Sequence, residues 1–171
     1  GEVGPDLAGL DAALLSAEPP WPPAWRCHAL ARERIGPVLS PRHQRYASLR
    51  KAPAAALLDE PLLYAASRPQ AWPAWAKARR LPVRGLRYGQ GFEHLHYLLE
   101  AAAAGLGVAI APAPLVADDL AAGRLAAPWG FAATKAQWLL ATPGRASDPR
   151  AAQLAAWLRE QFAQEPAGAR A

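Results

Sequence analysis

The sequence predicts an α/β fold, in which short apolar strands alternate with helices and form a sandwich of mostly parallel sheets covered on both faces. Two observations lead to this class. Apolar runs of four to six residues are repeatedly bounded by Gly or Pro, as buried strands are. Between them, residues 92–102 place Phe92, Leu95, Leu99 and Ala102 three or four positions apart, which is the spacing of an amphipathic helix.

The first half of the chain supplies the following elements in order. Strands are expected at residues 9–15, 25–30, 37–39, 62–65 and 85–88, with a proline loop at 19–23 and a crossover between lobes at 32–36. Helices are expected at 46–56, where Pro53 divides the segment into two pieces, and at 72–79, where Pro73 falls in the first turn and does no harm.

In the second half of the chain, Gly and Pro residues mark where the expected elements end. Gly105 and Gly107 end the helix that begins at Phe92, and a strand follows at 108–111. Pro112 and Pro114 end that strand, a short helix occupies 117–122, and Gly123 closes it before an extended stretch at 125–129. A strand at 137–141 is followed by a helix from Asp148, its cap, to Phe162, with Pro149 at its first position and a frayed tail at 161–171.

These blocks resemble a known family. The order of helix, Gly105-Leu-Gly-Val108, strand ending in Pro112, Asp118-Asp-Leu-Ala-Ala-Gly-Arg-Leu125 and Pro128-Trp129 is similar to the effector-binding domain of LysR-type transcriptional regulators. Within that family it is most similar to the branch of the glycine-cleavage and β-lactamase activators. Further blocks carry the similarity over most of the chain, at 9–15, 37–41, 59–64, 72–75, 137–143 and 148–162.

The resemblance implies a periplasmic-binding-protein-like (type 2) sandwich of two lobes with a ligand between them. The first lobe would comprise residues 1–35 and 126–171, and the second 36–125. The first lobe is expected to be incomplete, because the family has further elements before its counterpart of residue 6 or 10. A DNA-binding domain is absent from the sequence, so DNA would be bound only through a missing N-terminal part, in a homodimer or tetramer.

Composition sets broader limits. The chain has 171 residues, 52% of them hydrophobic, and no apolar run long enough to span a bilayer, so we expect a soluble cytoplasmic protein without membrane contact. The single cysteine, Cys27, cannot form an internal disulfide. The net charge of +5 allows a nucleic-acid surface, but the arginines are scattered, and the scarcity of Ile, Lys and Asn indicates codon bias instead.

The candidate effector-binding residues lie at predicted strand ends. If a helix begins at Phe92, the free N–H groups of residues 91–94 could hold a small anion, with Gln90, Gly91, Phe92 and Glu93 in the site; a plain tight turn is the alternative. Tyr64 and Ser67 follow another strand and could offer hydroxyls, although Ser67 could also simply start a turn. Trp129 and Trp21 could line the cleft, whereas Trp72, Trp75, Trp138 and Trp157 are interpreted as packing residues.

Catalytic, metal and cofactor sites are not predicted. His94 and His96 are two apart on a predicted helix, and Cys27 and His28 are neighbours on a predicted strand, so neither pair converges on a metal. No nucleophile has an evident base partner, and the acidic pairs at 59–60 and 118–119 are adjacent rather than opposed. We therefore expect a sensor without enzyme activity, whose effector is a small polar or anionic metabolite such as a carboxylate, an amino acid or a peptide; the alternative is the solute-binding protein of a transporter.

Overall fold

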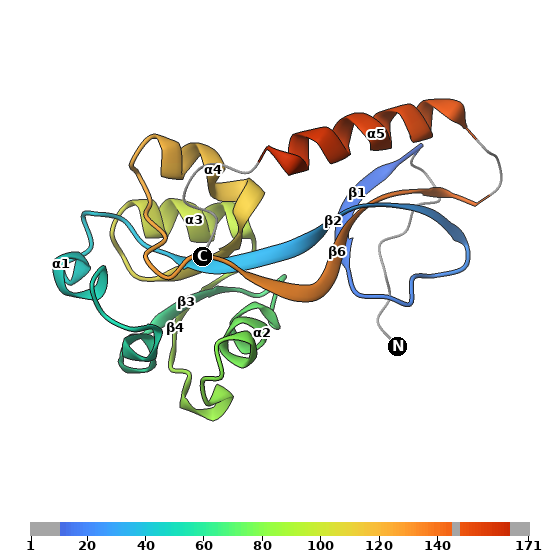
Figure 1. Cartoon of the computed structure of the whole chain (residues 1–171). Coiled ribbons are helices and arrows are strands. Elements are labelled where there is room, and N and C mark those ends of the chain that lie inside the picture. The colour runs from blue at the N-terminus through green and yellow to red at the C-terminus, as the bar shows by residue number, and fades with distance from the viewer. Residues whose placement is uncertain (1–10, 145–147, 165–171) are drawn as a thin grey trace. The chain divides into compact units, whose positions relative to one another are not determined.

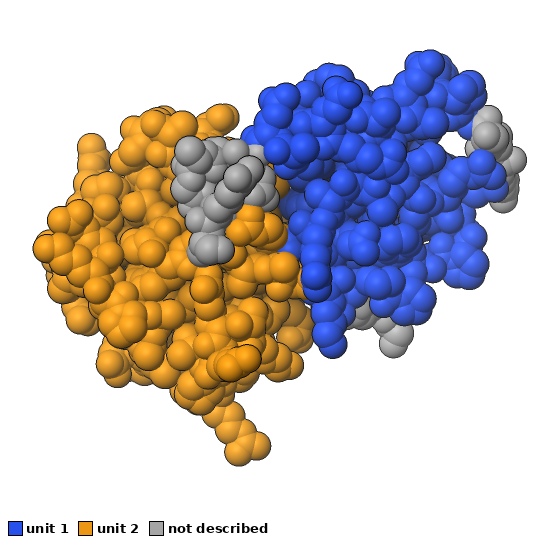
Figure 2. All heavy atoms as spheres, in the orientation of Figure 1, with its two compact units in different colours: residues 1–33, 135–164 blue, residues 34–134, 165–171 orange. Residues whose placement is uncertain are grey.

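The computed structural model describes residues 11–144 and 148–164, which form two compact units. Figure 2 colours them separately. Unit 1 contains residues up to 33 together with 135–164, and unit 2 contains residues 34–134. The chain enters unit 2 through the long strand β2 (Trp25–Val38) and leaves it through β6 (Ala132–Pro143), the two long ribbons of Figure 1.

Unit 1 is built from β1 (Ala13–Ala17), the first part of β2, most of β6 and helix α5 (Pro149–Ala163). β1 pairs antiparallel with β6 from Ala13 opposite Ala141 to Ala17 opposite Gln137. The apolar core of unit 1 is small. It contains Leu30, Trp138, Leu140 and Ala155, with Leu158 and Phe162 packed against them. One apolar face of α5 therefore closes this unit.

Unit 2 has helices and strands in alternation. They are α1 (Tyr46–Leu49), the 3-10 helix η1 (Ala54–Asp59), β3 (Leu62–Ala65), α2 (Ala71–Ala78), the 3-10 helix η2 (Val83–Gly85), β4 (Tyr88–Phe92), α3 (Leu95–Ala103), β5 (Ala109–Pro112) and α4 (Ala113–Ala121). β3 and β4 run parallel, and a parallel bridge joins Leu62 to Val108 just before β5. β5 is also antiparallel to β2, from Ile35 opposite Pro112 to Val38 opposite Ala109.

Alternation along these strands gives unit 2 two apolar cores. Leu63, Ala109 and Ala111 belong to a cluster that includes Leu98, Ala102 and Val116 of helices α3 and α4. Leu62, Val108 and Ile110 belong to a second cluster with Leu49, Leu57, Trp72 and Trp75 of α1, η1 and α2. Because successive side chains of a strand point to opposite faces, helices cover the sheet on both sides. The expected α/β sandwich is confirmed here.

Several predicted elements are confirmed. β3 has the predicted bounds, Pro53 separates α1 from η1, and α2 starts one residue early with Pro73 in its first turn. Gly105 and Gly123 take φ values of 86° and 71° after α3 and α4. In each case the N–H of the next residue reaches back to the carbonyl five positions earlier, as in a Schellman motif. Asp148 caps α5 by accepting a bond from the Arg150 N–H.

Other boundaries were wrong. β2 continues through residues 32–36, where a crossover separating two strands was expected, because Ile35 and Gly36 stay paired with β5. Residues 83–85 form a 3-10 turn, and the strand expected at 85–88 begins only at Tyr88. α4 begins at Ala113 and not at 117, since Pro114 fits a first turn whose N–H groups need no helical partner.

Strand directions and the ends of the chain also differ from expectation. The sheets are not mostly parallel: hydrogen bonding gives a four-stranded order β1-β6-β2-β5, with antiparallel β1–β6 and β2–β5 pairs. The strand expected at 9–15 is β1, which starts at Ala13; residues 9 and 10 lie outside the described residues. Of the expected tail, 161–163 belong to α5, and 165–171 lie outside the described residues.

Candidate functional site

Unit 2 contains a cavity of about 390 Å³ around the carboxyl-terminal half of β3. This volume falls within the range of roughly 300–1,000 Å³ that is usual for small-molecule sites. The lining residues are Tyr64, Ala65, Arg68, Pro69, Ala71, Trp72, Tyr88, Leu95, Leu98 and Ile110. They include members of both apolar clusters, so the cavity is found where the two layers of the unit meet at a strand end.

The turn after β3 brings a charged side chain to the cavity. The Arg68 N–H donates to the Ala65 carbonyl at 3.0 Å, and the Arg68 carbonyl accepts from Ala71 at 3.2 Å, which leads directly into α2. The end of β3 is fixed to the end of β4, because the Ala66 N–H donates to the Phe92 carbonyl at 2.7 Å. Ligands of parallel α/β sheets bind at such carboxyl-terminal strand ends.

Aromatic rings form much of the wall. Tyr64 and Tyr88 meet edge to face, with ring centroids 5.5 Å apart and an interplanar angle of 80°. Trp72 is fixed by its Nε1–H, which donates to the Leu63 carbonyl at 2.9 Å, and by an edge contact with Trp75. Burial raises the pKa of the Tyr88 hydroxyl, so this phenol stays neutral near pH 7 and can donate a hydrogen bond.

Gly91 determines where the Tyr64 ring can lie. A Cβ at position 91 would be 2.5 Å from Tyr64 Cζ and 2.7 Å from the Tyr64 hydroxyl, closer than real contacts allow. The two residues are register partners in the β3–β4 pair. The Tyr64 ring therefore occupies the space above a strand position that has no side chain.

The predicted helix terminus at residues 91–94 was wrong. Tyr88–Phe92 is strand β4, and helix α3 begins at Leu95 with His94 as its cap residue. Two glycines did not prevent a strand, because β4 pairs along β3 through Gly91 and Phe92. Gln90 and Glu93 are exposed, and Phe92 packs against the cluster of α3 and α4.

The remaining predicted site residues are divided between the cavity, the core and the other unit. Tyr64 lines the cavity, whereas Ser67 is exposed and next in sequence to Arg68. Trp129 is buried in the core of unit 2, where its Nε1–H donates to the Ala52 carbonyl at 2.9 Å. Trp21 belongs to unit 1 and donates its Nε1–H to the Ala17 carbonyl at 3.3 Å.

Sequence reasoning missed Arg68, Trp72, Tyr88 and the α3 leucines of the cavity. Trp72 and Leu95 were interpreted as core, and Arg68 was passed over in favour of the neighbouring hydroxyl. One signal could have identified Arg68: it is the first charged residue after a buried strand, in the turn before a helix. Tyr88 could be found only from the pairing of β4 with β3.

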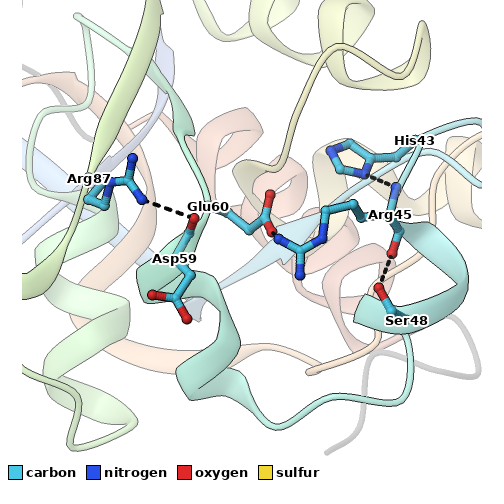
Figure 3. Close-up of polar contacts among 6 residues, drawn as sticks. All are labelled: His43, Arg45, Ser48, Asp59, Glu60 and Arg87. Atoms are coloured by element: carbon cyan, nitrogen blue, oxygen red, sulfur yellow. Dashed lines mark hydrogen bonds and ion pairs between the residues drawn. The ribbon is translucent and has the colours of Figure 1, made fainter.

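A polar cluster lies just before β3, and none of its residues labelled in Figure 3 lines the cavity. The Arg45 guanidinium pairs with Glu60, a residue only 5% exposed, and the Arg45 N–H donates to His43 Nδ1 at 3.1 Å. Arg87 donates to the Asp59 carbonyl at 3.2 Å. The contacts join α1, η1 and the residue before β4, so this cluster holds the entry of β3 in place.

Residues 11–144 and 148–164 contain no group of three His, Cys, Asp or Glu side chains that could hold a metal ion, and no helix long and apolar enough to cross a membrane.

Comparison with known proteins identifies the family. The family model for the LysR substrate binding domain matches residues 7–163. The chain belongs to the LysR substrate-binding domain family. It is 65% identical over 163 residues to the HTH-type transcriptional regulator TrpI of Pseudomonas aeruginosa, covering 95% of this chain and 55% of that protein. The chain thus spans about half the length of this curated relative.

Other LysR-type regulators agree with this assignment. The HTH-type transcriptional activator AmpR of Pseudomonas aeruginosa is 34% identical over 103 residues, which cover 59% of this chain and 35% of that protein. The solved effector domain of AmpR from the same organism is 27% identical, with a TM-score of 0.70, over 91% of this chain and 72% of that one. The AmpR effector-binding domain of Citrobacter freundii has the same TM-score at 22% identity, over 91% of this chain and 76% of that one, which shows the shared fold.

The chain is therefore an effector-binding domain of the LysR type, as the motifs predicted. The family is not enzymatic, which agrees with the expectation of no catalysis. The alternative of a transporter's solute-binding protein is not supported, since the family model is that of the LysR substrate binding domain and the relative that matches 95% of this chain is a transcriptional regulator.

Proposed function

We propose that this domain senses a small-molecule effector for a longer transcriptional regulator, and that the cavity at the end of β3 is where unit 2 contacts the effector. The observation that carries this proposal is the position of the cavity. It lies at the carboxyl end of a parallel strand, with aromatic walls and one arginine, in a domain of an effector-binding family.

The predicted two-lobed arrangement extends this proposal. Unit 2 would be the second lobe of the family's arrangement and unit 1 the first. An effector can change the conformation only if it binds one arrangement of the lobes more tightly than another. The longer protein would bind DNA through a separate domain, as a homodimer or tetramer in the cytoplasm.

A reporter assay with the complete gene tests this function. Candidate metabolites are first screened for binding to the purified domain, and any that bind are added to cells carrying a reporter for the regulated promoter. A Trp72→Ala variant that still folds should lose both binding and the reporter response, because it removes a wall of the cavity. A matched Trp157→Ala variant changes an exposed residue of α5 and should keep both.

The two measurements have clear negative outcomes. A metabolite that changes reporter output while binding equally well to Trp72→Ala would place the effector site elsewhere. A regulator whose output no metabolite changes, although ligands bind the domain, would contradict the sensing role itself.

A further inference from the structure

The shape and lining of the cavity restrict the ligand more than the family does. Three of its walls are aromatic, from Tyr64, Trp72 and Tyr88, and most of the others are aliphatic, from Leu95, Leu98 and Ile110. The Trp72 Nε1–H already donates to the Leu63 carbonyl and the side chain is only 1% exposed, so Trp72 lines the cavity from the core and offers no free polar group to it. Aromatic side chains in such walls favour flat rings, which stack or meet them edge to face.

Arg68 is the one charged side chain among the described residues that line the cavity. Its backbone is held by the turn between β3 and α2, with hydrogen bonds to Ala65 and from Ala71. A guanidinium suits a planar anion such as a carboxylate, to which it can donate two parallel hydrogen bonds. No acidic residue lines the cavity in the described part of the chain.

We propose that the cavity takes a flat, ring-containing ligand that carries one anionic group, with its ring against Tyr64, Trp72 and Tyr88 and its anion at Arg68. This inference rests on the proposed function only in treating the cavity as the effector site. It is narrower than the small polar or anionic metabolite expected from the sequence, because an aliphatic amino acid or a small dicarboxylate would leave the aromatic walls unfilled.

Gly91 acts as a specificity-determining position for this ligand. The Tyr64 ring lies where a Cβ of residue 91 would be, so any larger residue there must displace the ring. Because the same ring lines the cavity and contacts Tyr88, its displacement changes the width available to a ligand ring. Gly91 does not line the cavity and affects the ligand only through Tyr64.

Three probes separate the ring from the charge. Phenylacetate has both, phenylacetamide has the ring without the charge, and hexanoate has the charge without the ring. At about −0.3 kcal/mol per heavy atom, phenylacetate should bind with a Kd in the millimolar range, which calorimetry and ligand-observed NMR can measure. We expect phenylacetate to bind about tenfold or more tightly than either of the other probes.

Arginine variants test the anion's position. Arg68→Gln should weaken phenylacetate binding by about 10-fold or more, as expected for a charged hydrogen bond, and leave phenylacetamide binding within about twofold. Arg84→Gln is the matched control, because Arg84 is exposed in η2 and does not line the cavity. The proposal would be overturned if phenylacetate did not bind, or if hexanoate bound as tightly as phenylacetate. It would also be overturned if Arg68→Gln left the affinity for phenylacetate unchanged.

The role of Gly91 is tested through selectivity. Gly91→Ala should change the ratio of Kd values for phenylacetate and the larger naphthylacetate by about fivefold or more. In a Tyr64→Ala background the same substitution should have no effect on this ratio, because the ring it displaces is gone. Gly89→Ala is the control, since its Cβ would meet Pro61 at 3.1 Å and not Tyr64. An effect that persists without the Tyr64 ring would contradict the mechanism.

A competition experiment separates the ligand class from the function. If the effector found in the reporter screen lacks a ring or an anionic group and yet displaces phenylacetate, the proposed class is wrong while the sensing function stands. If phenylacetate binds as expected but no ligand of the cavity changes reporter output, the proposed ligand class is supported and the proposed sensing function is wrong.

Discussion

Trp129 is anchored at both its side chain and its backbone. Its Nε1–H donates to the Ala52 carbonyl at 2.9 Å, and its own carbonyl accepts from the Arg79 guanidinium at 2.7 Å. The residue is 8% exposed and packs in the cluster with Trp72 and Trp75. These contacts give Trp129 a structural role: it ties the segment before β6 to the helices of unit 2.

The variant Trp129→Phe should lower the free energy of unfolding by about 1–3 kcal/mol, because the Ala52 carbonyl loses its donor and a cavity opens. Urea denaturation monitored by circular dichroism measures this change. Trp157→Phe provides the control: Trp157 is 55% exposed, so its replacement should change stability by less than about 0.5 kcal/mol. Equal effects of both variants would show that the bond to Ala52 contributes nothing.

Single residues show how far sequence reasoning reaches. Trp72, Trp75 and Trp138 are buried as predicted, but Trp157, also interpreted as a packing residue, is mostly exposed. On α5 the core faces Ala155, Leu158 and Phe162, and Trp157 points elsewhere. Hydrophobicity alone could not separate them, because an Ala-rich helix has no sharply apolar face. Likewise, the sequence places Tyr64 at a strand end but cannot show that its ring crosses Gly91.

At the level of elements, α5 depends on its first turn. The Asp148 carboxylate accepts from the Arg150 N–H at 2.9 Å and pairs with its guanidinium, also at 2.9 Å. Hydrogen bonds from the Arg150 side chain, and then from its N–H, lower the pKa of Asp148 below the usual 3.8. The ionised cap is therefore favoured in the folded protein more than in the unfolded chain.

This shift predicts a pH-dependent contribution of the cap. Since the folded-state pKa is lowered, the stabilisation is present above about pH 4 and is lost as the pH falls through the folded-state value. The side chain is solvent-exposed, so the effect is small and sensitive to salt. Compared with Asp148→Asn, which keeps an acceptor but does not titrate, the wild-type domain should have a higher urea midpoint at about pH 6 and lose that advantage near pH 3. A constant difference between the two proteins would contradict this explanation.

The start of β3 is held by the ion pair between Arg45 and Glu60, whose two side chains differ in solvent exposure. Glu60 is buried, whereas the Arg45 side chain is about half exposed. Removing the arginine leaves a buried carboxylate without its cation, so Arg45→Met should destabilise the domain by about 1–3 kcal/mol. Adding Glu60→Gln to Arg45→Met should recover part of the loss, and a double-mutant cycle of urea midpoints measures the coupling. Additive effects would show that the pair contributes no interaction energy.

Elements with strong boundary residues were predictable, and elements fixed by pairing were not. Pro53, Gly105, Gly123 and Asp148 mark boundaries through their own backbone or side-chain chemistry, and the structure confirms each one. Tyr88–Phe92 contains two glycines and four exposed positions in a row, so the local pattern favours a turn. Only the neighbouring strand β3 makes it a strand.

For the whole molecule, a ligand of the cavity should stabilise the fold by mass action. At a free concentration of 100 times Kd, a ligand that binds only the folded state adds about 2.7 kcal/mol. For a domain of this size, that corresponds to a rise in Tm of roughly 5–11 °C. Differential scanning fluorimetry measures the shift, and Trp72→Ala should abolish it. A rise that persists in this variant would indicate binding outside the cavity.

The family and the α/β class of the whole molecule were accessible from ordered motifs spread along the chain. Strand direction could not be predicted, because the sequence of β1 contains nothing that distinguishes a parallel from an antiparallel partner. The cavity was inaccessible for a related reason. Its lining comes from β3, α2, β4, α3 and β5, and only their packing shows which side chains share one space.

The β1–β6 pair joins two segments of the chain that are synthesised at different times. Ala17 pairs with Gln137, so β1 is synthesised roughly 120 residues before its partner, and the whole of unit 2 comes between them. At about 5–20 residues per second, β1 waits for roughly 6–24 s with its edge unpaired. Unit 2 is one continuous segment and can fold during that interval. Until β6 has left the ribosome, the edge of β1 that pairs with it therefore remains available to chaperones.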